Sequence, residues 1–339
     1  MQPLNTNLNL MMIKTLILLS LLFSNIALAG DASLLNVSYD VSREYYKELN
    51  AAFIQYWKNK TGETVSINQS HGGSSKQARA VADGLPADVI SMNRAPDIDI
   101  LYQRAKLIPA DWQSRLPNAS APTASTSVFL VRKGNPKKIH DWDDLVKTNI
   151  SVIIPNPKTS GNGKYAYLAA WGYIIKNGGD DAKAKEFVTK LFKNVPVLDT
   201  GGRGATTTFA QRDIGDVLVT FENEVYLIKK ELGDDKFEVI YPSISVLAEN
   251  PITLVDKVVD THKTRALAQA YLNFHYSETG QEIAARHYLR PQTESSIAKY
   301  QSKFKQLNLF KVDEVFGSWD KAEKIHFADD GLFDQIYTK

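Results

Sequence analysis

The sequence predicts an α/β fold of two lobes, each a sheet flanked by helices, with a ligand cleft between the lobes. Three observations predict it. Short apolar runs alternate with helical patterns along most of the 339 residues. This alternation occurs twice, and residues 117–127, rich in proline, serine, threonine and alanine, are expected to form a surface connection between the two series. Glycine-rich loops stand at three of the strand-to-helix junctions. A chain of this length can bury a core in each of two lobes.

The first lobe is predicted to begin with residues 30–125 and to contain an open parallel sheet. Strand-like runs at residues 34–39, 65–68 and 87–91 alternate with helical patterns, and the third run is short and apolar, as in a buried parallel strand. Ligands of such sheets bind outside the carboxyl ends of the strands. We therefore expect the ligand at the edge where the glycine-rich loops begin.

The second lobe is predicted at residues 126–247 and has its own alternation of strands and helices. Residues 248–339 are predicted to return to the first lobe and to end in a C-terminal helical extension at residues 304–337. Two or more crossings between lobes form a hinge, about which lobes close on a ligand. The strands expected in the second lobe are residues 128–132, 152–154, 195–198 and 217–221, with helices starting at Lys164 and Ala205.

The loop at residues 155–163 is suited to hold an anion. It follows an apolar strand, is rich in glycine and hydroxyl groups, and precedes a helix. Glycine lets successive backbone N–H groups approach a ligand, and the start of a helix adds unpaired N–H groups and the positive end of its dipole. The loop is not a phosphate-binding Walker A loop, because Tyr165 rather than serine or threonine follows Lys164.

The same design recurs at residues 71–75 and 200–204, each between a strand-like run and a helical pattern. A single glycine-rich turn before a helix is common and would be weak support. Three loops of one chemistry predict one anion that is held from several sides.

Residues 1–29 have the features of a cleaved secretory signal peptide. Lys14 precedes a short apolar run, and Ala27 and Ala29 form a cleavage pattern of small residues. The apolar run is short for a permanent membrane anchor. We therefore expect export to a bacterial periplasm.

Charge and sulfur content narrow the function further. A formal net charge of +2 offers no general field for nucleic acid or an anionic membrane surface. The chain has no cysteine, and of its four methionines only Met92 lies beyond the predicted signal. This scarcity fits a protein made when sulfur is limiting, although chance and avoidance of free thiols would also produce it.

Several stretches resemble the periplasmic sulfate- and thiosulfate-binding proteins that feed an ABC importer. The resemblance covers essentially the whole chain after the signal. It implies a two-lobed periplasmic binding protein of type II and a non-enzymatic role in transport. The implied partners are the anion, two permease subunits and an ATPase; the chain would act as a monomer, without cofactor, metal or nucleic acid. The stretches that carry it are residues 35–40, 69–74, 129–136, 155–161, 167–172 and 313–317.

In that family the dehydrated dianion is held by neutral donors, mostly backbone N–H groups at helix starts. The resemblance implies such backbone donors here, and for Ser160 also the hydroxyl. Two further residues resemble those that support the loops from behind. The donors carried over are Ser74, Ser160, Gly161, Asn162 and Gly202, and the supporting residues are Asp40 and Arg203.

Phe221 departs from the sulfate-binding members, in which a tryptophan at this position donates its indole N–H to the anion. Phenylalanine has no donor. The thiosulfate-binding members resemble this chain more closely, since they share the phenylalanine and also residues 39–44, 107–112 and 199–209. A phenyl ring leaves room for a larger, less strongly hydrated sulfur atom, so we expect thiosulfate to be preferred and sulfate to be accepted.

Other functions stay open at this point. Asp40 or Asp199 could accept a proton from phosphate, and molybdate would need a wider site. Ser296 and Lys299 match an S-x-x-K motif of exported serine hydrolases, but the other motifs of that class are missing or in the wrong order. The six histidines form no close metal-binding cluster, and His71 is expected to fix its turn rather than to contact the anion.

Overall fold

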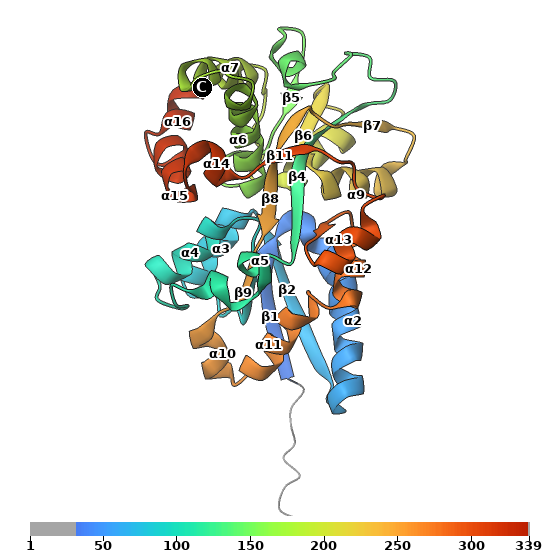
Figure 1. Cartoon of the computed structure of the whole chain (residues 1–339), viewed down its shortest axis with the longest axis vertical. Coiled ribbons are helices and arrows are strands. Elements are labelled where there is room, and N and C mark those ends of the chain that lie inside the picture. Colours follow the sequence, from blue (N-terminus) through green and yellow to red (C-terminus); the bar gives the residue numbers. More distant parts are fainter. Residues whose placement is uncertain (1–31, 338–339) are drawn as a thin grey trace, which may run out of the picture. The chain divides into compact units, whose positions relative to one another are not determined.

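The computed structural model of the protein describes residues 32–337, and the chain from Ser33 onward forms one compact unit (Figure 1). The predicted signal peptide at residues 1–29 lies outside the described residues. Within residues 32–337, no helix has the length and apolar character that a membrane crossing requires.

One sheet has the strand order β2-β1-β3-β9. β1 and β3 are parallel, with Val37 opposite Ile90, whereas β9 is antiparallel to β3. The sheet is therefore mixed, and the expectation of a parallel sheet is wrong for its last strand, which arrives from late in the chain. The strands are β1 (Ala32–Tyr39), β2 (Val65–Gly72), β3 (Val89–Ser91) and β9 (Ile252–Leu254).

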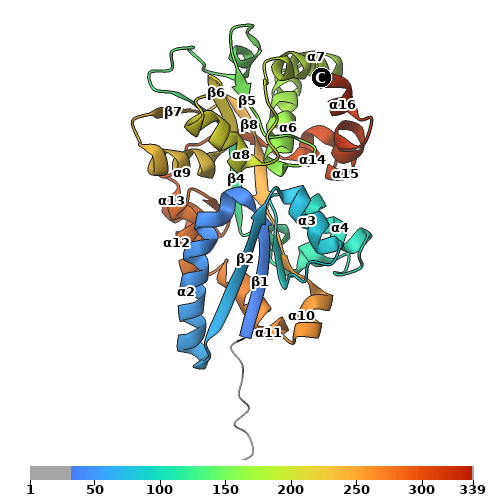
Figure 2. The ribbon, with the colours of Figure 1, turned by 180° about the vertical axis from the view of Figure 1, so that it is seen from behind.

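Helices from both ends of the chain cover this sheet, which with them forms the first lobe. Figure 2 shows the long helix α2 beside β2 and β1. Gly62 ends α2 in the left-handed conformation that glycine adopts most readily. The helices are α2 (Arg43–Thr61), α3 (Ser74–Ala82), α4 (Ala95–Gln103), α10 (Asp256–His262), α11 (Arg265–Phe274), α12 (Glu278–Arg286) and α13 (Glu294–Tyr300).

The other sheet is built around β4, whose ten residues are nearly all buried. β6, β7, β8 and β10 pair with it antiparallel, β5 is parallel to β6, and β11 is parallel to β8. Residues 195–198, expected to be a strand, lie outside the sheet. The strands are β4 (Thr123–Arg132), β5 (Val152–Ile153), β6 (Val217–Phe221), β7 (Phe237–Ile240), β8 (Ile244–Asn250), β10 (Arg290–Pro291) and β11 (Asn308–Phe310).

This sheet and its helices form the second lobe. α6 contributes a face so apolar that its residues from Gly161 to Tyr173 are all buried. A Cβ at Gly172 would overlap the ring of Phe310, so this glycine lets β11 lie close to α6. The helices are α6 (Gly161–Lys176), α7 (Asp181–Lys193), α8 (Gly202–Thr206) and α9 (Glu222–Leu232).

β4 and β8 connect the two sheets, and the predicted lobe boundaries fall inside them. Thr126 pairs with Leu247, and Ser125 pairs with Ala248. The expectation of a surface connection up to residue 127 is wrong from Ser120 onward, because residues 120–127 are buried and residues 123–126 pair with β8. The division at residues 125/126 and 247/248 remains a proposal, now with both crossings on paired strands.

The C-terminal segment differs from its predicted place. Residues 304–337 were expected to extend the first lobe, but they pack on α6 and α7 of the second lobe (Figure 1). Burial of aromatic rings explains this placement, since His326 and Phe333 contact the rings of Tyr167 and Phe192. The segment contains α14 (Val312–Phe316), α15 (Trp319–Ala322), a wider helical turn at Glu323–Phe327 and α16 (Leu332–Ile336).

Candidate anion-binding site

The three glycine-rich loops predicted to hold an anion meet at one place. A Cβ at Gly73 of the first loop would lie 2.8 Å from the carbonyl oxygen of Thr159 and 3.0 Å from that of Thr200. The Thr159 hydroxyl also donates to the Thr200 carbonyl at 2.9 Å. Backbone from both lobes is therefore in van der Waals contact, at a separation that leaves no room for a side chain at residue 73.

The first loop presents the start of α3. The carbonyl of Gly73 accepts the N–H groups of Lys76 and Gln77, both at 2.9 Å, so the backbone turns directly into the helix at Ser74. The first N–H groups of a helix have no intrahelical acceptor, and that of Ser74 is among them. The Ser74 hydroxyl is engaged behind the loop, where it donates to Asp97.

His71 is the first residue of this loop, and among the described residues its ring is bonded to a hydroxyl rather than to a carboxylate. Its Nδ1 lies 2.7 Å from the hydroxyl oxygen of Ser38. Burial, and then the nearby charge of Arg43, lower the pKa of His71 to about 4. The imidazole is therefore neutral at neutral pH and adds no positive charge to the loop.

The second loop presents the start of α6. The Ser160 hydroxyl caps this helix by accepting the N–H of Gly163 at 3.3 Å. The N–H of Ser160 donates to the Asn156 carbonyl at 2.9 Å, so it is engaged within the loop, unlike the prediction that it is offered to the anion. Gly161 and Asn162 are the first two residues of α6, where N–H groups lack helical acceptors.

The third loop leads into α8 and contacts residues of both lobes. A Cβ at Gly202 would lie 2.7 Å from Cγ1 of Val41 and 3.0 Å from Nδ2 of Asn162. The next residue, Arg203, donates its backbone N–H to Oδ2 of Asp40 at 3.1 Å. Asp40 of the first lobe thus holds the third loop in place. Burial raises the pKa of Asp40, although the N–H of Arg203 acts in the opposite direction.

Phe221 lies beside the second loop at the end of β6. Its side chain is fully buried, and its ring centroid is 5.7 Å from that of Tyr165 in α6. The preceding residue, Thr220, accepts a hydrogen bond from Nδ2 of Asn162 at 2.7 Å. The structure therefore brings all the predicted ligands and Phe221 into one neighbourhood.

The buried cations near the loops are bound by carboxylates. Arg94 forms ion pairs with Asp97 and Glu323, and its guanidinium also donates to the Ser75 hydroxyl at 3.0 Å. Lys164 lies 2.7 Å from the same carboxylate of Glu323. Burial and the neighbouring Arg94 lower the pKa of Lys164 to about 8. Glu323 thus bridges a cation of the first lobe and a cation of the second.

Arg94 and Glu323 were not singled out from the sequence. They are 229 residues apart, and neither belongs to a glycine-rich loop. An isolated arginine and an isolated glutamate carry no pattern that a sequence could reveal. The contact depends on the C-terminal segment packing on the second lobe, which was itself not predicted.

A second buried ionic group lies behind the third loop. Glu224 accepts hydrogen bonds from the Thr206 hydroxyl at 2.6 Å and from Arg203 at 3.2 Å, and its Oε2 has no partner among the described residues. Burial raises the pKa of Glu224 to about 7, although Arg203 acts in the opposite direction. The side chain of Arg203 also pairs with Glu231 at 3.0 Å.

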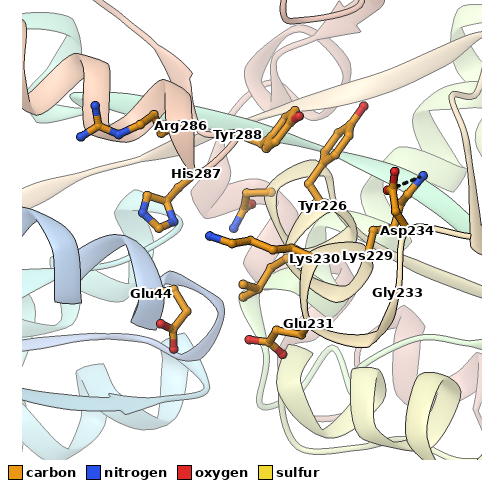
Figure 3. A pocket seen from close by; sticks show the side chains of 12 residues that line it. Glu44, Tyr226, Lys229, Lys230, Glu231, Gly233, Asp234, Arg286, His287 and Tyr288 are labelled. Atoms are coloured by element: carbon orange, nitrogen blue, oxygen red, sulfur yellow. Dashed lines mark ion pairs between the residues drawn. The ribbon is translucent and has the colours of Figure 1, made fainter.

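A pocket of about 590 Å³ lies beside this group, between α9 and residues of the first lobe, and none of the predicted anion ligands lines it (Figure 3). Its charges are of both signs, and several are paired. Lys229 is 3.2 Å from Asp234, and Glu231 pairs with Arg203. Lys230 points into the pocket toward His287 (Figure 3). This mixture does not favour a buried dianion as the neutral loops do.

The structure does not support the two alternative sites considered from the sequence, a serine hydrolase site and a metal site. Lys299 is 3.2 Å from Glu278 and is not hydrogen-bonded to Ser296, so the S-x-x-K residues do not form a nucleophile and base. Across residues 32–337, no group of three or more histidine, cysteine, aspartate or glutamate side chains is arranged to hold a metal ion. The arrangement that remains is a set of helix starts converging from two lobes, which is suited to an anion.

The bridging carboxylate of Glu323 gives a first prediction. Glu323→Gln would leave the buried Lys164 facing a neutral amide and would leave Arg94 with Asp97 as its remaining carboxylate. We expect the free energy of unfolding to fall by about 2–3 kcal/mol, below the value for a fully buried pair because Glu323 is 29% exposed. Urea denaturation would measure this. The matched control is Glu314→Gln, which removes an exposed partner of α6, Lys176, at 3.2 Å, and should cost under about 1 kcal/mol. Equal losses would contradict the bridge.

The raised pKa of Glu224 gives a second prediction. In the folded protein the pKa of Glu224 is raised to about 7, whereas an unfolded glutamate takes up its proton near the ordinary pKa of 4.5. Between these values the folded state holds more protons, so Glu224 contributes less stability as pH rises. The free energy of unfolding of wild type minus that of Glu224→Gln should fall by up to about 3 kcal/mol from pH 4.5 to 7 and then level off.

Denaturation at several pH values, in chloride salts without oxyanions, would measure this difference. Glu231→Gln is the control, because it also removes a carboxylate from Arg203 but at an exposed position. The same slope in both variants would show that the effect does not come from burial of Glu224.

Comparison with known proteins agrees with this geometry. Residues 36–290 match the family described as bacterial extracellular solute-binding protein. The thiosulfate-binding protein of Pseudomonas aeruginosa is 58% identical over 329 residues, covering 96% of this chain and 99% of the relative. The sulfate-binding protein of Salmonella typhimurium is 55% identical over 317 residues, covering 93% of this chain and 96% of the relative.

A solved structure gives the same result for the fold. The sulfate-binding protein SubI from Mycobacterium tuberculosis H37Rv superposes with a TM-score of 0.79 at 30% identity, covering 86% of this chain and 98% of SubI. The predicted two-lobed α/β fold and the resemblance to sulfate- and thiosulfate-binding proteins are confirmed. The chain belongs to the bacterial extracellular solute-binding proteins, a family of binding proteins rather than enzymes.

Proposed function

We propose that this protein is a periplasmic receptor that captures thiosulfate or sulfate between its lobes and delivers it to an ABC importer. The observation that carries the proposal is the convergence of three glycine-rich helix starts, one from the first lobe and two from the second. Relatives that are more than half identical over nearly the whole chain are named for these two anions.

The proposed ligands are neutral. They are the backbone N–H groups of Ser74, Gly161, Asn162 and Gly202 and the hydroxyl of Ser160, with Phe221 bordering the site and Asp40 and Arg203 supporting the third loop. A hydrogen bond to a charged group contributes about 1.5–3 kcal/mol net, so five of them can offset a costly dehydration. Backbone donors are fixed by the fold and need little reorganisation when the anion arrives.

Neutral donors also suit the charge state of the ligand. Sulfate and thiosulfate carry no proton at neutral pH, so they need donors only. A protonated phosphate would need an acceptor at the site. Of the two candidate acceptors, Asp40 already accepts the N–H of Arg203, whereas Oδ2 of Asp199 has no partner among the described residues, so the phosphate titration below decides this alternative.

Cellular location and partners follow from the same proposal. Residues 1–29 would direct export and be removed in the periplasm. Two permease subunits with an associated ATPase would receive the anion, and the chain would act as a monomer. The scarcity of sulfur in the chain, with no cysteine and few methionines, suits a protein made during sulfur limitation.

Titration calorimetry tests the function. Residues 30–339, stripped of bound anion by partial unfolding and dialysis, would be titrated with thiosulfate, sulfate, phosphate and molybdate. We expect tight binding of both sulfur anions and no heat from phosphate. Tight binding of phosphate or molybdate instead would keep the fold and overturn the sulfur assignment. If no anion binds, the proposed function as an anion receptor is wrong.

The preference for thiosulfate generates a third prediction. Phe221→Trp would restore an indole N–H beside the second loop and reduce the space for a second sulfur atom. We expect the thiosulfate-to-sulfate affinity ratio to fall about tenfold or more, the value of one hydrogen bond to a charged group. Calorimetry with both anions would measure it.

Phe209→Trp is the control for enlarging a buried ring, because Phe209 is also fully buried in the second lobe but packs on Arg132 and Phe237, whereas Phe221 packs on Tyr165 of α6. An unchanged affinity ratio in Phe221→Trp would refute the explanation of the preference, whatever the function.

A further inference from the structure

Asn93 lies at the junction of the lobes, and nothing in the sequence marked it. It follows β3 after one residue, Met92, whose N–H is anchored on the carbonyl of Pro251 at 2.9 Å. The residue after it, Arg94, is fixed by its ion pairs with Asp97 and Glu323. The backbone of Asn93 is therefore held between two anchors, which leaves its side chain a narrow range of directions.

The side chain of Asn93 points at the start of α6. A Cβ at Gly161 would overlap Oδ1 of Asn93 and would lie 3.0 Å from its Nδ2. The whole amide group thus lies against the backbone of Gly161, the first residue of α6. This places it beside the second loop, across the junction from its own lobe.

The amide of Asn93 is buried, and its oxygen is unpaired. Asn93 is 2% exposed, and its Oδ1 has no hydrogen-bond partner among the described residues. A buried polar group without a partner costs about 1–3 kcal/mol, so each such group calls for an explanation. Rotation about the bond between Cβ and Cγ can turn either the oxygen or the NH₂ group toward α6, so the amide can donate there.

Neighbouring polar side chains are already engaged. Arg94 and Lys164 share Glu323, the Ser74 hydroxyl donates to Asp97, and Nδ2 of Asn162 donates to Thr220. Oδ1 of Asn162 is unpaired among the described residues like that of Asn93, but the Asn162 NH₂ group is already engaged, whereas the NH₂ group of Asn93 can be turned toward a ligand at the start of α6.

We propose that Asn93 is a further ligand of the bound anion, to which its amide NH₂ group donates a hydrogen bond from the first lobe. The inference rests on the proposed function. A neutral donor fits a site that holds a dianion without a paired cation, and it adds a side-chain donor where Phe221 supplies none. Because Gly161 and Asn162 belong to the other lobe, an anion bound to all three joins the lobes directly.

Calorimetry with thiosulfate and sulfate on three variants tests this assignment. Asn93→Ala removes the donor, and we expect the affinity for both anions to fall about 10- to 100-fold. Asn93→Asp keeps the shape but replaces the donor with an acceptor of negative charge, so the affinity should fall further. Asn50→Ala is the control, since Asn50 is a buried asparagine of the first lobe whose Oδ1 accepts a hydrogen bond from Tyr271, and its affinity should equal that of wild type.

The outcomes separate the two proposals. If the wild-type protein binds neither anion, the proposed function fails, whatever the variants do. If wild type binds and Asn93→Ala binds equally well, Asn93 is not a ligand and this inference is overturned. Should Asn93→Ala fail to fold, as judged by its circular dichroism, Asn93→Asp decides: reduced affinity supports the inference, and wild-type affinity overturns it.

Discussion

Close approach of backbone to backbone is the constraint on which the site depends. Three helix starts can converge on one small anion only if the residues at their contacts carry no side chain of their own. At Gly73 and Gly202 a Cβ would stand about 3 Å or less from atoms of another loop, and at Gly161 it would overlap Asn93. Glycine at these places is required by contact with other segments, not by an unusual backbone angle, since none of the three has a positive φ.

The charges around the site follow from the same constraint. A site built of neutral N–H groups keeps its net charge low only if nearby ionic side chains neutralise one another. Arg94 and Lys164 share Glu323, and Arg203 lies between Glu224 and Glu231. In both ionic groups the cations are paired with carboxylates that lie beside the loops rather than within them. The protein can therefore hold cations close to a dianion without pairing them with it, so release does not require breaking a buried ion pair with the ligand.

The local features were predictable, and the contacts between distant segments were not. Strand and helix periodicity located β1, α2, β6 and α6. The loop at residues 155–163 was predicted from its glycines, because the backbone conformation of a turn before a helix depends mainly on the residues in the turn itself. The antiparallel entry of β9, the buried pairing of Thr123 and the packing of residues 304–337 on α6 depend on partners far along the chain. Asn93 and Glu323 also depend on distant partners, since Asn93 lies against Gly161 and Glu323 forms an ion pair with Arg94.

The connection between the lobes has a consequence for binding. β4 and β8 cross as a paired ribbon, at Thr126 and Leu247, so a hinge motion there would leave both sheets intact. Contacts away from the ribbon would then break on opening, namely those of Asp40 with Arg203 and of Arg94 with Glu323. These contacts favour the closed state even before an anion binds, so the ligand has less closure energy to supply. If the lobes open at this ribbon, the affinity for the anion depends on the interface between the lobes as well as on the donors that touch the anion.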